Sequence, residues 1–297
     1  MKKSLEEKII PASKHKRNVA EFFGGRAIYW RQIYDRNEES ISQYYHHFMN
    51  KRKEAVLAYL DRFSQGDSLK VLDAGCGPGS LAEEIAKRGH KTTGLDYSLD
   101  MVAQASRSVE SAGTKCARFI QGDLDSLPFQ DSSFDAVICV GVLQYLPDDR
   151  ISIAELGRVL RPGGIAIITF PNIFRISNLF DPVYYFRGIK YGIHLIARRL
   201  PSRKKPADPM DCSTNRMFSN RRYVFGQRRG AFLRSRLTSV DETCIGFGPL
   251  TFWRRPYLPE RFSLSLSDRL DHASRRCGMR WLRFFSNRWV ISFKKDT

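Results

Sequence analysis

Along the middle of the chain, short runs of consecutive hydrophobic residues alternate with segments in which hydrophobic residues recur at helical spacing. Short apolar runs predict strands, and between these runs apolar residues recur at helical spacing. Strands that alternate with helices predict a parallel, doubly wound α/β sheet. The predicted strands are 70–73, 91–96, 117–123, 134–140 and 165–170, and the predicted helices between them are 80–89, 100–112 and 149–160.

The flanking segments have different patterns. Residues 21–63 carry aromatic residues at roughly helical spacing, which predicts two or three helices, the last over 42–63, covering the open end of the sheet. After position 171 the pattern is irregular, with a helix predicted at 220–236, a strand at 237–247, a helix at 264–276 and a closing strand at 288–294. We therefore expect a flexible basic arm (1–20), a helical cap (21–63), a core (64–171), a basic amphipathic insertion (172–219) and a C-terminal completion of the sheet (220–297).

Charge is unevenly distributed along the 297 residues, whose net charge is +18. Positions 172–297 hold 26 Lys and Arg residues against 9 Asp and Glu residues, whereas positions 64–171 hold 10 against 14. The basic part predicts either an anionic partner or a solvated basic face without a partner. An anionic partner here is a phosphate-bearing acceptor, a nucleic acid or an acidic membrane surface.

The cysteines and the distribution of apolar residues indicate in which cellular compartment the protein is expected. The six cysteines are scattered without a C-x-x-C pair, which favours buried thiols in a reducing compartment over a zinc site or a disulfide framework. No metal site is predicted. The first residues are charged without a following apolar run, and no stretch approaches the ~20 apolar residues of a transmembrane helix. We expect a cytoplasmic protein.

The strongest chemical signal is the glycine-rich turn 75–79, Gly-Cys-Gly-Pro-Gly, between the first strand and its helix. Glycines allow the backbone to turn sharply and to approach a ligand closely. Asp96, about 20 residues after Gly75, ends the next strand, where a carboxylate can accept both hydroxyls of a ribose. Asp123 ends the third strand and can receive the amino group of an adenine. Pro78 lacks the amide proton that the pyrophosphate of a dinucleotide would use, which disfavours a nicotinamide or flavin dinucleotide.

Together these features resemble the class I S-adenosylmethionine-dependent methyltransferases of the small-molecule branch, whose pattern V-L-D-x-G-C-G-x-G matches residues 71–79. The resemblance is close from about 55 to 170. It implies S-adenosyl-L-methionine as cofactor and a Rossmann-like sheet of about seven strands, the last antiparallel and inserted between the fifth and sixth. By this resemblance the cofactor-binding residues are Asp73, Gly75, Cys76, Gly77 and Gly79 around the methionine part, Asp96 at the ribose, Gly122, Asp123 and Leu124 at the adenine with Tyr97 and Met101 beside it, and Val140 and Tyr145 beside the methyl group.

The candidate catalytic residues are His46 and His47 in the helical cap and Tyr145 after the fourth strand. Methyl transfer from a sulfonium mainly needs positioning, and a general base is required only for a protonated acceptor such as a hydroxyl. Adjacent helix positions point about 100° apart, so at most one of the two histidines can face a given pocket. The alternative interpretation is a surface or core-capping histidine at either position and a simple wall at Tyr145.

Three functions are compatible with these patterns. The favoured one is methyl transfer, first of all to oxygen, of a lipophilic or bulky small molecule such as a quinone, tetrapyrrole or polyketide-type metabolite. The basic and aromatic residues of 172–200 would then suit peripheral contact with an anionic membrane surface. The second is an RNA or protein methyltransferase that uses the basic C-terminal half, but no RNA-binding module is recognisable and nucleic acid is not an expected partner. The third is a cofactor-binding scaffold without catalysis.

Overall fold

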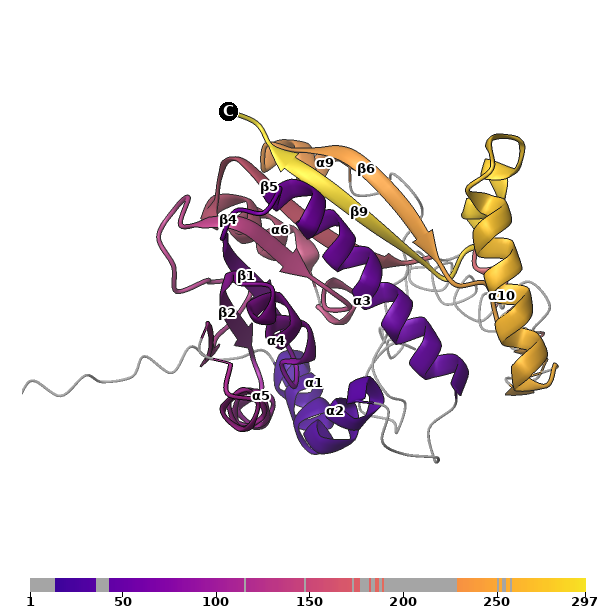
Figure 1. The fold of residues 1–297 in the computed structure, drawn as a ribbon, viewed down its shortest axis with the longest axis horizontal. Helices are drawn as coiled ribbons and strands as arrows, with labels where there is room; N and C mark the ends of the chain where they lie inside the picture. Colours follow the sequence, from indigo (N-terminus) through magenta and orange to yellow (C-terminus); the bar gives the residue numbers. More distant parts are fainter. Residues whose placement is uncertain are drawn as a thin grey trace, which may run out of the picture.

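The computed structural model describes residues 14–35, 43–172, 174–176 and 229–297 apart from positions 115, 147, 250, 253, 254 and 257, together with the separate positions 182, 185, 186 and 189. Its centre is a seven-stranded sheet in the order β3-β2-β1-β4-β5-β9-β6 (Figure 1). The strands are β1 (Lys70–Ala74), β2 (Lys91–Asp96), β3 (Ala117–Gln121), β4 (Phe134–Cys139), β5 (Leu160–Pro171), β6 (Leu237–Ile245) and β9 (Arg288–Lys295).

The sheet has the predicted topology. Strands β1 to β5 pair in parallel, and β9 pairs antiparallel with both β5 and β6. The doubly wound sheet with an antiparallel last strand between the fifth and sixth is therefore confirmed. Because β9 runs against its neighbours, its first residue, Arg288, lies opposite the last residue of β5, Pro171. The beginning of β9 thus joins the edge at which the parallel strands end.

Helices cover both faces of the sheet because side chains alternate along each strand. Val71, Ile138 and Ile167 share a buried cluster with α3 (Gln43–Ser64) and α4 (Ser80–Lys87). The neighbouring residues Leu72, Val137 and Ile168 share the other cluster with α6 (Asp149–Val159) and α9 (Arg229–Arg234). Helix α5 (Leu99–Ser111) packs against β2 and β3.

The N-terminal segment is more ordered than its polarity predicts. Residues 14–20, expected to belong to a flexible arm, form the first turns of α1 (Lys14–Gly24). The next helix is α2 (Ala27–Asp35), and both α1 and α2 pack against α5. Gly24 allows this approach, since a Cβ there would lie 2.6 Å from Ser98 Oγ. The helical cap of α1, α2 and α3 is thus built on the core (Figure 1).

The remaining differences concern element ends. Strand β5, predicted over 165–170, begins earlier, at Leu160, with a register shift opposite β4. The helix expected from position 264 begins earlier, as α10 (Glu260–Ser274). The insertion 172–219 lies almost entirely outside the described residues, as does the first part of the helix expected at 220–236.

Short elements complete the fold: η1 (Leu143–Tyr145), β7 (Thr251–Phe252), β8 (Arg255–Pro256) and η2 (Cys277–Phe285). None of the described helices combines the length and the apolar character needed to cross a bilayer.

The glycine-rich turn follows β1 and is fixed to β2. The amides of Gly75 and Cys76 both donate to Leu95 O, at 2.6 and 3.0 Å. Gly75 has a φ of +80°, and a Cβ on it would lie 2.3 Å from Val142 Cγ2. Gly77 has a φ of +54°, but a Cβ there would meet no atom within 4 Å. A residue with a side chain at either position would adopt an unfavourable positive φ, but only a side chain at Gly75 would also clash with a neighbour.

We expect Gly75→Ala to lower the free energy of unfolding by about 2–4 kcal/mol, because it adds a clash to the cost of a left-handed conformation. The matched variant Gly77→Ala should lose only about 1–2 kcal/mol, since it carries the conformational cost alone. Urea denaturation of both proteins without ligand measures the difference. Equal losses would contradict the close contact between Gly75 and Val142.

Candidate functional site

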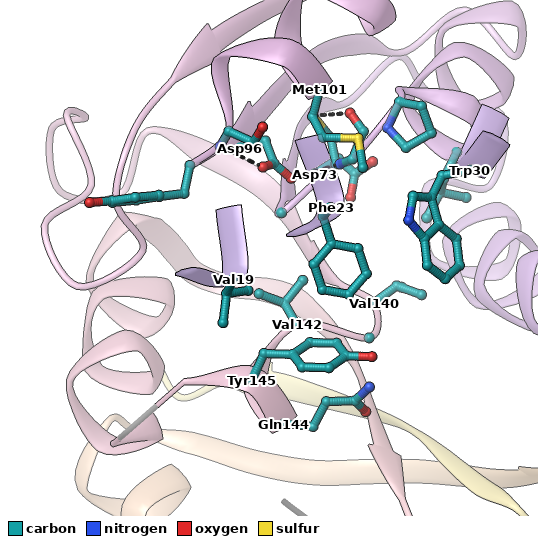
Figure 2. A pocket seen from close by; sticks show the side chains of 18 of the residues that line it. Val19, Phe23, Trp30, Asp73, Asp96, Met101, Val140, Val142, Gln144 and Tyr145 are labelled. Atoms are coloured by element: carbon teal, nitrogen blue, oxygen red, sulfur yellow. Dashed lines mark hydrogen bonds between the residues drawn. The ribbon is translucent and has the colours of Figure 1, made fainter. Parts of the chain in front are cut away.

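A pocket lies at the carboxyl ends of the parallel strands, between the core and the helical cap (Figure 2). Each of the first four strands contributes residues from its end or from the loop that follows it, and α1, α2 and α3 close the other side. This is the position at which open α/β sheets bind ligands. Of the residues predicted to bind a cofactor, the lining includes Asp73, Gly75, Cys76, Gly77, Asp96, Tyr97, Met101, Asp123, Leu124, Val140 and Tyr145.

Two predicted residues, Gly79 and Gly122, shape the pocket without lining it. Gly79 precedes α4 with a φ of +82°, and a Cβ there would lie 2.7 Å from Ala105 Cβ on α5. The amide of Gly122 donates to Asp96 O at 3.0 Å. Their contribution is to bring neighbouring segments close together.

Asp96 connects the glycine-rich turn to the start of α5. Its Oδ2 accepts a hydrogen bond from the amide of Gly77 at 2.9 Å, and its Oδ1 accepts one from the amide of Ser98 at 2.9 Å (Figure 2). Burial raises the pKa of the Asp96 carboxyl, while these backbone bonds lower it. Each carboxylate oxygen has two lone pairs, so both can accept a further hydrogen bond from a ligand hydroxyl.

Asp73 is the most strongly perturbed acid of the pocket. Burial, followed by the nearby charge of Asp96, raises its pKa to about 7, and Arg52 acts in the opposite direction. The Asp73 side chain is almost fully buried, and within the described part of the chain its Oδ2 has no hydrogen-bond partner. A buried carboxylate oxygen without a donor is costly. A ligand that brings a cationic donor would satisfy it.

Two arginines of the pocket were not identified from the sequence. Arg52 on α3 is only 5% exposed, and its Nη1 is 3.0 Å from the position that a Cβ on Gly141 would take. Arg288 at the start of β9 donates from Nη1 to Gln144 Oε1 at 2.8 Å. The available signal for Arg52 is helical spacing, because Tyr45, Met49 and Arg52 form one stripe of α3 that lines the pocket.

Helix α1 closes the pocket over the third and fourth strands. Lys16 Nζ lies 2.6 Å from Asp123 Oδ1 and 2.5 Å from Asp125 Oδ2, so the carboxylate predicted to meet an adenine is already paired with the cap. The ring of Phe23 contacts that of Tyr145 edge-on, with centroids 5.0 Å apart, and Trp30 lies beside Phe23 at 5.3 Å. The cap therefore supplies both a cation and an aromatic wall.

The structure does not bring the two candidate histidines to the pocket. His47 Nε2 lies 2.8 Å from Asp268 Oδ1 on α10, and neither His46 nor His47 lines the cavity. Lys51, one turn further along α3, pairs with the same Asp268 and with Asp271. The side of α3 that carries His47 and Lys51 therefore contacts α10. Of the three predicted catalytic side chains, only Tyr145 faces the cavity.

Comparison with known proteins identifies the core. Residues 72–168 match the family model described as a methyltransferase domain. A sterol 24-C-methyltransferase of Gibberella zeae is 41% identical over 116 residues, which are 38% of this chain and 30% of that protein. A demethylmenaquinone methyltransferase of Geobacillus stearothermophilus is 32% identical over 163 residues, which are 52% of this chain and 66% of that protein. The chain therefore matches less than two thirds of the length of either relative.

A solved structure shares the fold over nearly the whole chain. The magnesium protoporphyrin IX methyltransferase of Synechocystis PCC 6803 with bound SAM superposes with a TM-score of 0.60, covering 97% of this chain and 100% of that one. The sequences are 16% identical, so this likeness concerns the architecture alone. The seven-stranded sheet and the N-terminal helices are thus features of a methyltransferase fold.

The raised pKa of Asp73 predicts a measurable pH dependence. In the folded state this carboxyl keeps its proton up to a pKa of about 7, whereas the unfolded chain loses it near 3.8. The folded state therefore binds more protons between these values, and its stability falls as the pH rises through this window. Asp73→Asn removes the titration, so from pH 5 to pH 8 the variant should gain about 2–3 kcal/mol relative to the wild type.

Urea denaturation of the ligand-free proteins at the two pH values tests this expectation. Comparing how the stability of each protein changes between the two pH values cancels any pH-independent effect of losing the charge interaction with Arg52. Parallel stability curves for Asp73→Asn and wild type would contradict the raised pKa.

Proposed function

We propose that the chain is a class I S-adenosylmethionine-dependent methyltransferase that transfers a methyl group to a lipophilic or bulky small molecule, on the premise that residues 72–168 match a methyltransferase domain. The finer part of the proposal is an oxygen acceptor on a quinone, tetrapyrrole or polyketide-type metabolite. The observation that carries it is the combination of one pocket with acidic residues at the strand ends and an aromatic wall on the cap.

The charged groups of the pocket fit S-adenosyl-L-methionine. Asp96 would accept the ribose hydroxyls, and the unsatisfied Oδ2 of Asp73 would take a hydrogen bond from the amino group of the methionine part. The only anionic group of this cofactor is its carboxylate, and Arg52 is the buried cation beside Asp73 and Gly141. The adenine would lie toward Asp123, Leu124 and Met101. The three aspartates and Arg52 therefore each have a complementary group on the cofactor.

The acceptor would occupy the part of the pocket between the cap and the loop after β4. Phe23, Trp30, Tyr45 and Tyr145 supply aromatic surface there, and Gln144 and Arg288 supply a polar end. Such a lining suits a ring system or an apolar chain with a polar substituent. The two relatives named above bear names that refer to a sterol and to a menaquinone precursor, which supports a lipophilic acceptor.

Catalysis would rest mainly on positioning. The bound cofactor supplies a methyl group on a positively charged sulfonium. The aromatic rings of Phe23, Trp30 and Tyr145 exclude water from the space in front of it, and the Tyr145 side chain orients the acceptor. Holding the reacting atoms in line can lower the barrier by about 7–11 kcal/mol at the limit. Neither His46 nor His47 has a part in this proposal.

The RNA or protein alternative rests on the basic residues after position 171, most of which before position 229 lie outside the described part of the chain. The described pocket favours the small-molecule acceptor, because the cap closes it with α1 and aromatic side chains. We also propose that the protein works in the cytoplasm and at the surface of a membrane, where lipophilic acceptors accumulate.

We expect Asp96→Asn to weaken the binding of S-adenosylmethionine about 10- to 100-fold, because a hydrogen bond to a charged group contributes about 1.5–3 kcal/mol. Isothermal titration calorimetry measures the dissociation constant. Glu110→Gln, at an exposed position near the end of α5, is the matched control and should bind like the wild type. Wild-type affinity in Asp96→Asn would remove the ribose assignment.

The acceptor class can be found with methyl-labelled S-adenosylmethionine and a fractionated cell extract. The proposal predicts label in the lipid or organic-soluble fraction with the wild type and much less with Asp96→Asn at a cofactor concentration near the wild-type dissociation constant. Label in RNA or protein would establish the alternative instead. If cofactor binds but no fraction takes up label, the chain is a scaffold without catalysis.

A further inference from the structure

The segment η2 turns aromatic side chains toward solvent. In a 3-10 helix, residues three apart lie on the same face. After a non-helical Met279, residues 280–285 form such a stretch, in which Leu282 and Phe285 pack on the core. Trp281 and Phe284 share another face and are 58% and 53% exposed. Since aromatic side chains contribute the most apolar area, the exposure of Trp281 and Phe284 makes this face of η2 a candidate docking surface.

The exposed aromatic residues are joined by other apolar side chains. Met279 is 36% exposed, and Phe174, just after β5, is 49% exposed. Asn172 links the two segments, because its Nδ2 donates to Phe284 O at 2.6 Å and its Oδ1 accepts from the amide of Phe174 at 3.0 Å. We call Phe174, Met279, Trp281 and Phe284, with the arginines described next, the η2 surface.

Positive charge adjoins these apolar residues. Arg275, Arg276 and Arg280 are all exposed, two at the end of α10 and one within η2. Arg283 is used differently, since its Nε donates to Ser274 O and fastens η2 to α10. Arginines beside outward aromatic residues are complementary to the interface of a bilayer with anionic lipids, where Trp and Phe enter the headgroup region and the cations meet phosphates.

The η2 surface lies near the edge that carries the pocket. Its last residue, Phe284, comes four positions before Arg288, which lines the cavity, and Asn172 follows directly on β5. In Figure 1 the neighbouring helix α10 stands beyond the sheet, next to the end of β6 and the beginning of β9. A bilayer that contacts η2 would therefore be close to the acceptor side of the pocket.

We propose that the η2 surface docks the protein on the surface of an anionic phospholipid bilayer. The inference goes beyond the proposed methyl transfer and names the residues of the contact. It agrees with a lipophilic acceptor but does not depend on cofactor binding. An RNA partner fits less well, because Met279 offers no aromatic face on which a base can stack.

The test is co-sedimentation of the full chain with vesicles of phosphatidylcholine alone and of equal parts phosphatidylcholine and phosphatidylglycerol. The wild type should pellet with the mixed vesicles and much less with neutral ones. Trp281→Ser combined with Phe284→Ser should weaken this binding at least tenfold. Arg275→Gln, Arg276→Gln and Arg280→Gln together should weaken it by a similar factor or more, since each cation near such a surface contributes roughly fivefold.

Matched controls change equally exposed residues elsewhere. Val240→Ser on β6 removes an apolar side chain that is 65% exposed, and Arg107→Gln on α5 removes an exposed cation. Both should pellet like the wild type. All variants should keep wild-type affinity for S-adenosylmethionine, so that failure of docking and failure of the proposed function are distinguishable.

Three results would overturn the proposal. One is a wild type that does not prefer the mixed vesicles. Another is a Trp281 and Phe284 double variant that pellets like the wild type, which would place any membrane contact elsewhere in the chain. The third is binding of total RNA that is lost in the arginine variant and competes with the vesicles, since the surface would then be a nucleic-acid site.

Discussion

The site depends on the hydrogen bonds that the Asp96 carboxylate accepts from the amides of Gly77 and Ser98. These two bonds hold the glycine-rich turn after β1 against the beginning of α5, and they fix the carboxylate at the carboxyl edge of the sheet. The turn can lie there because Leu95 O receives the amides of Gly75 and Cys76. The parallel order β3-β2-β1-β4 then places Asp123, Asp96, Asp73 and the loop with Tyr145 side by side along one edge.

The same edge brings opposite charges together. Burial raises the pKa of both the Asp73 and the Asp96 carboxyl, and the charge of Asp96 raises the pKa of Asp73 further, whereas Arg52 from the cap lowers it. Asp123 is paired with Lys16 of α1. The Asp123 carboxylate therefore has two functions, because it pairs with Lys16 of α1 and would also accept a hydrogen bond from the amino group of an adenine. A cationic donor on a ligand would satisfy the buried Oδ2 of Asp73, which has no hydrogen-bond partner within the described residues.

The sequence allowed the core to be predicted because periodicity, glycine turn and strand-end acids all agree there. The order of the sheet and the place of β9 followed from the family resemblance. The cap was harder, because a polar stretch such as Lys14–Ala20 gives little sign of packing until its partner, α5, is known. Arg288 was missed because its role arises only from tertiary contacts, whereas the sequence signal for Arg52 is limited to the helical stripe that it shares with Tyr45 and Met49. His46 and His47 attracted attention by residue type, but which face of α3 meets the pocket is decided by packing against α10.

We propose that the acidic strand ends and Arg52 form the binding site of S-adenosylmethionine. A crystal structure of the full chain with S-adenosylhomocysteine is the decisive measurement. We expect the ribose on Asp96, the amino group of the methionine part on Asp73, its carboxylate on Arg52, and the adenine next to Asp123 and Met101. A ligand bound elsewhere, or one whose carboxylate lies away from Arg52 with its ribose away from Asp96, would overturn this assignment.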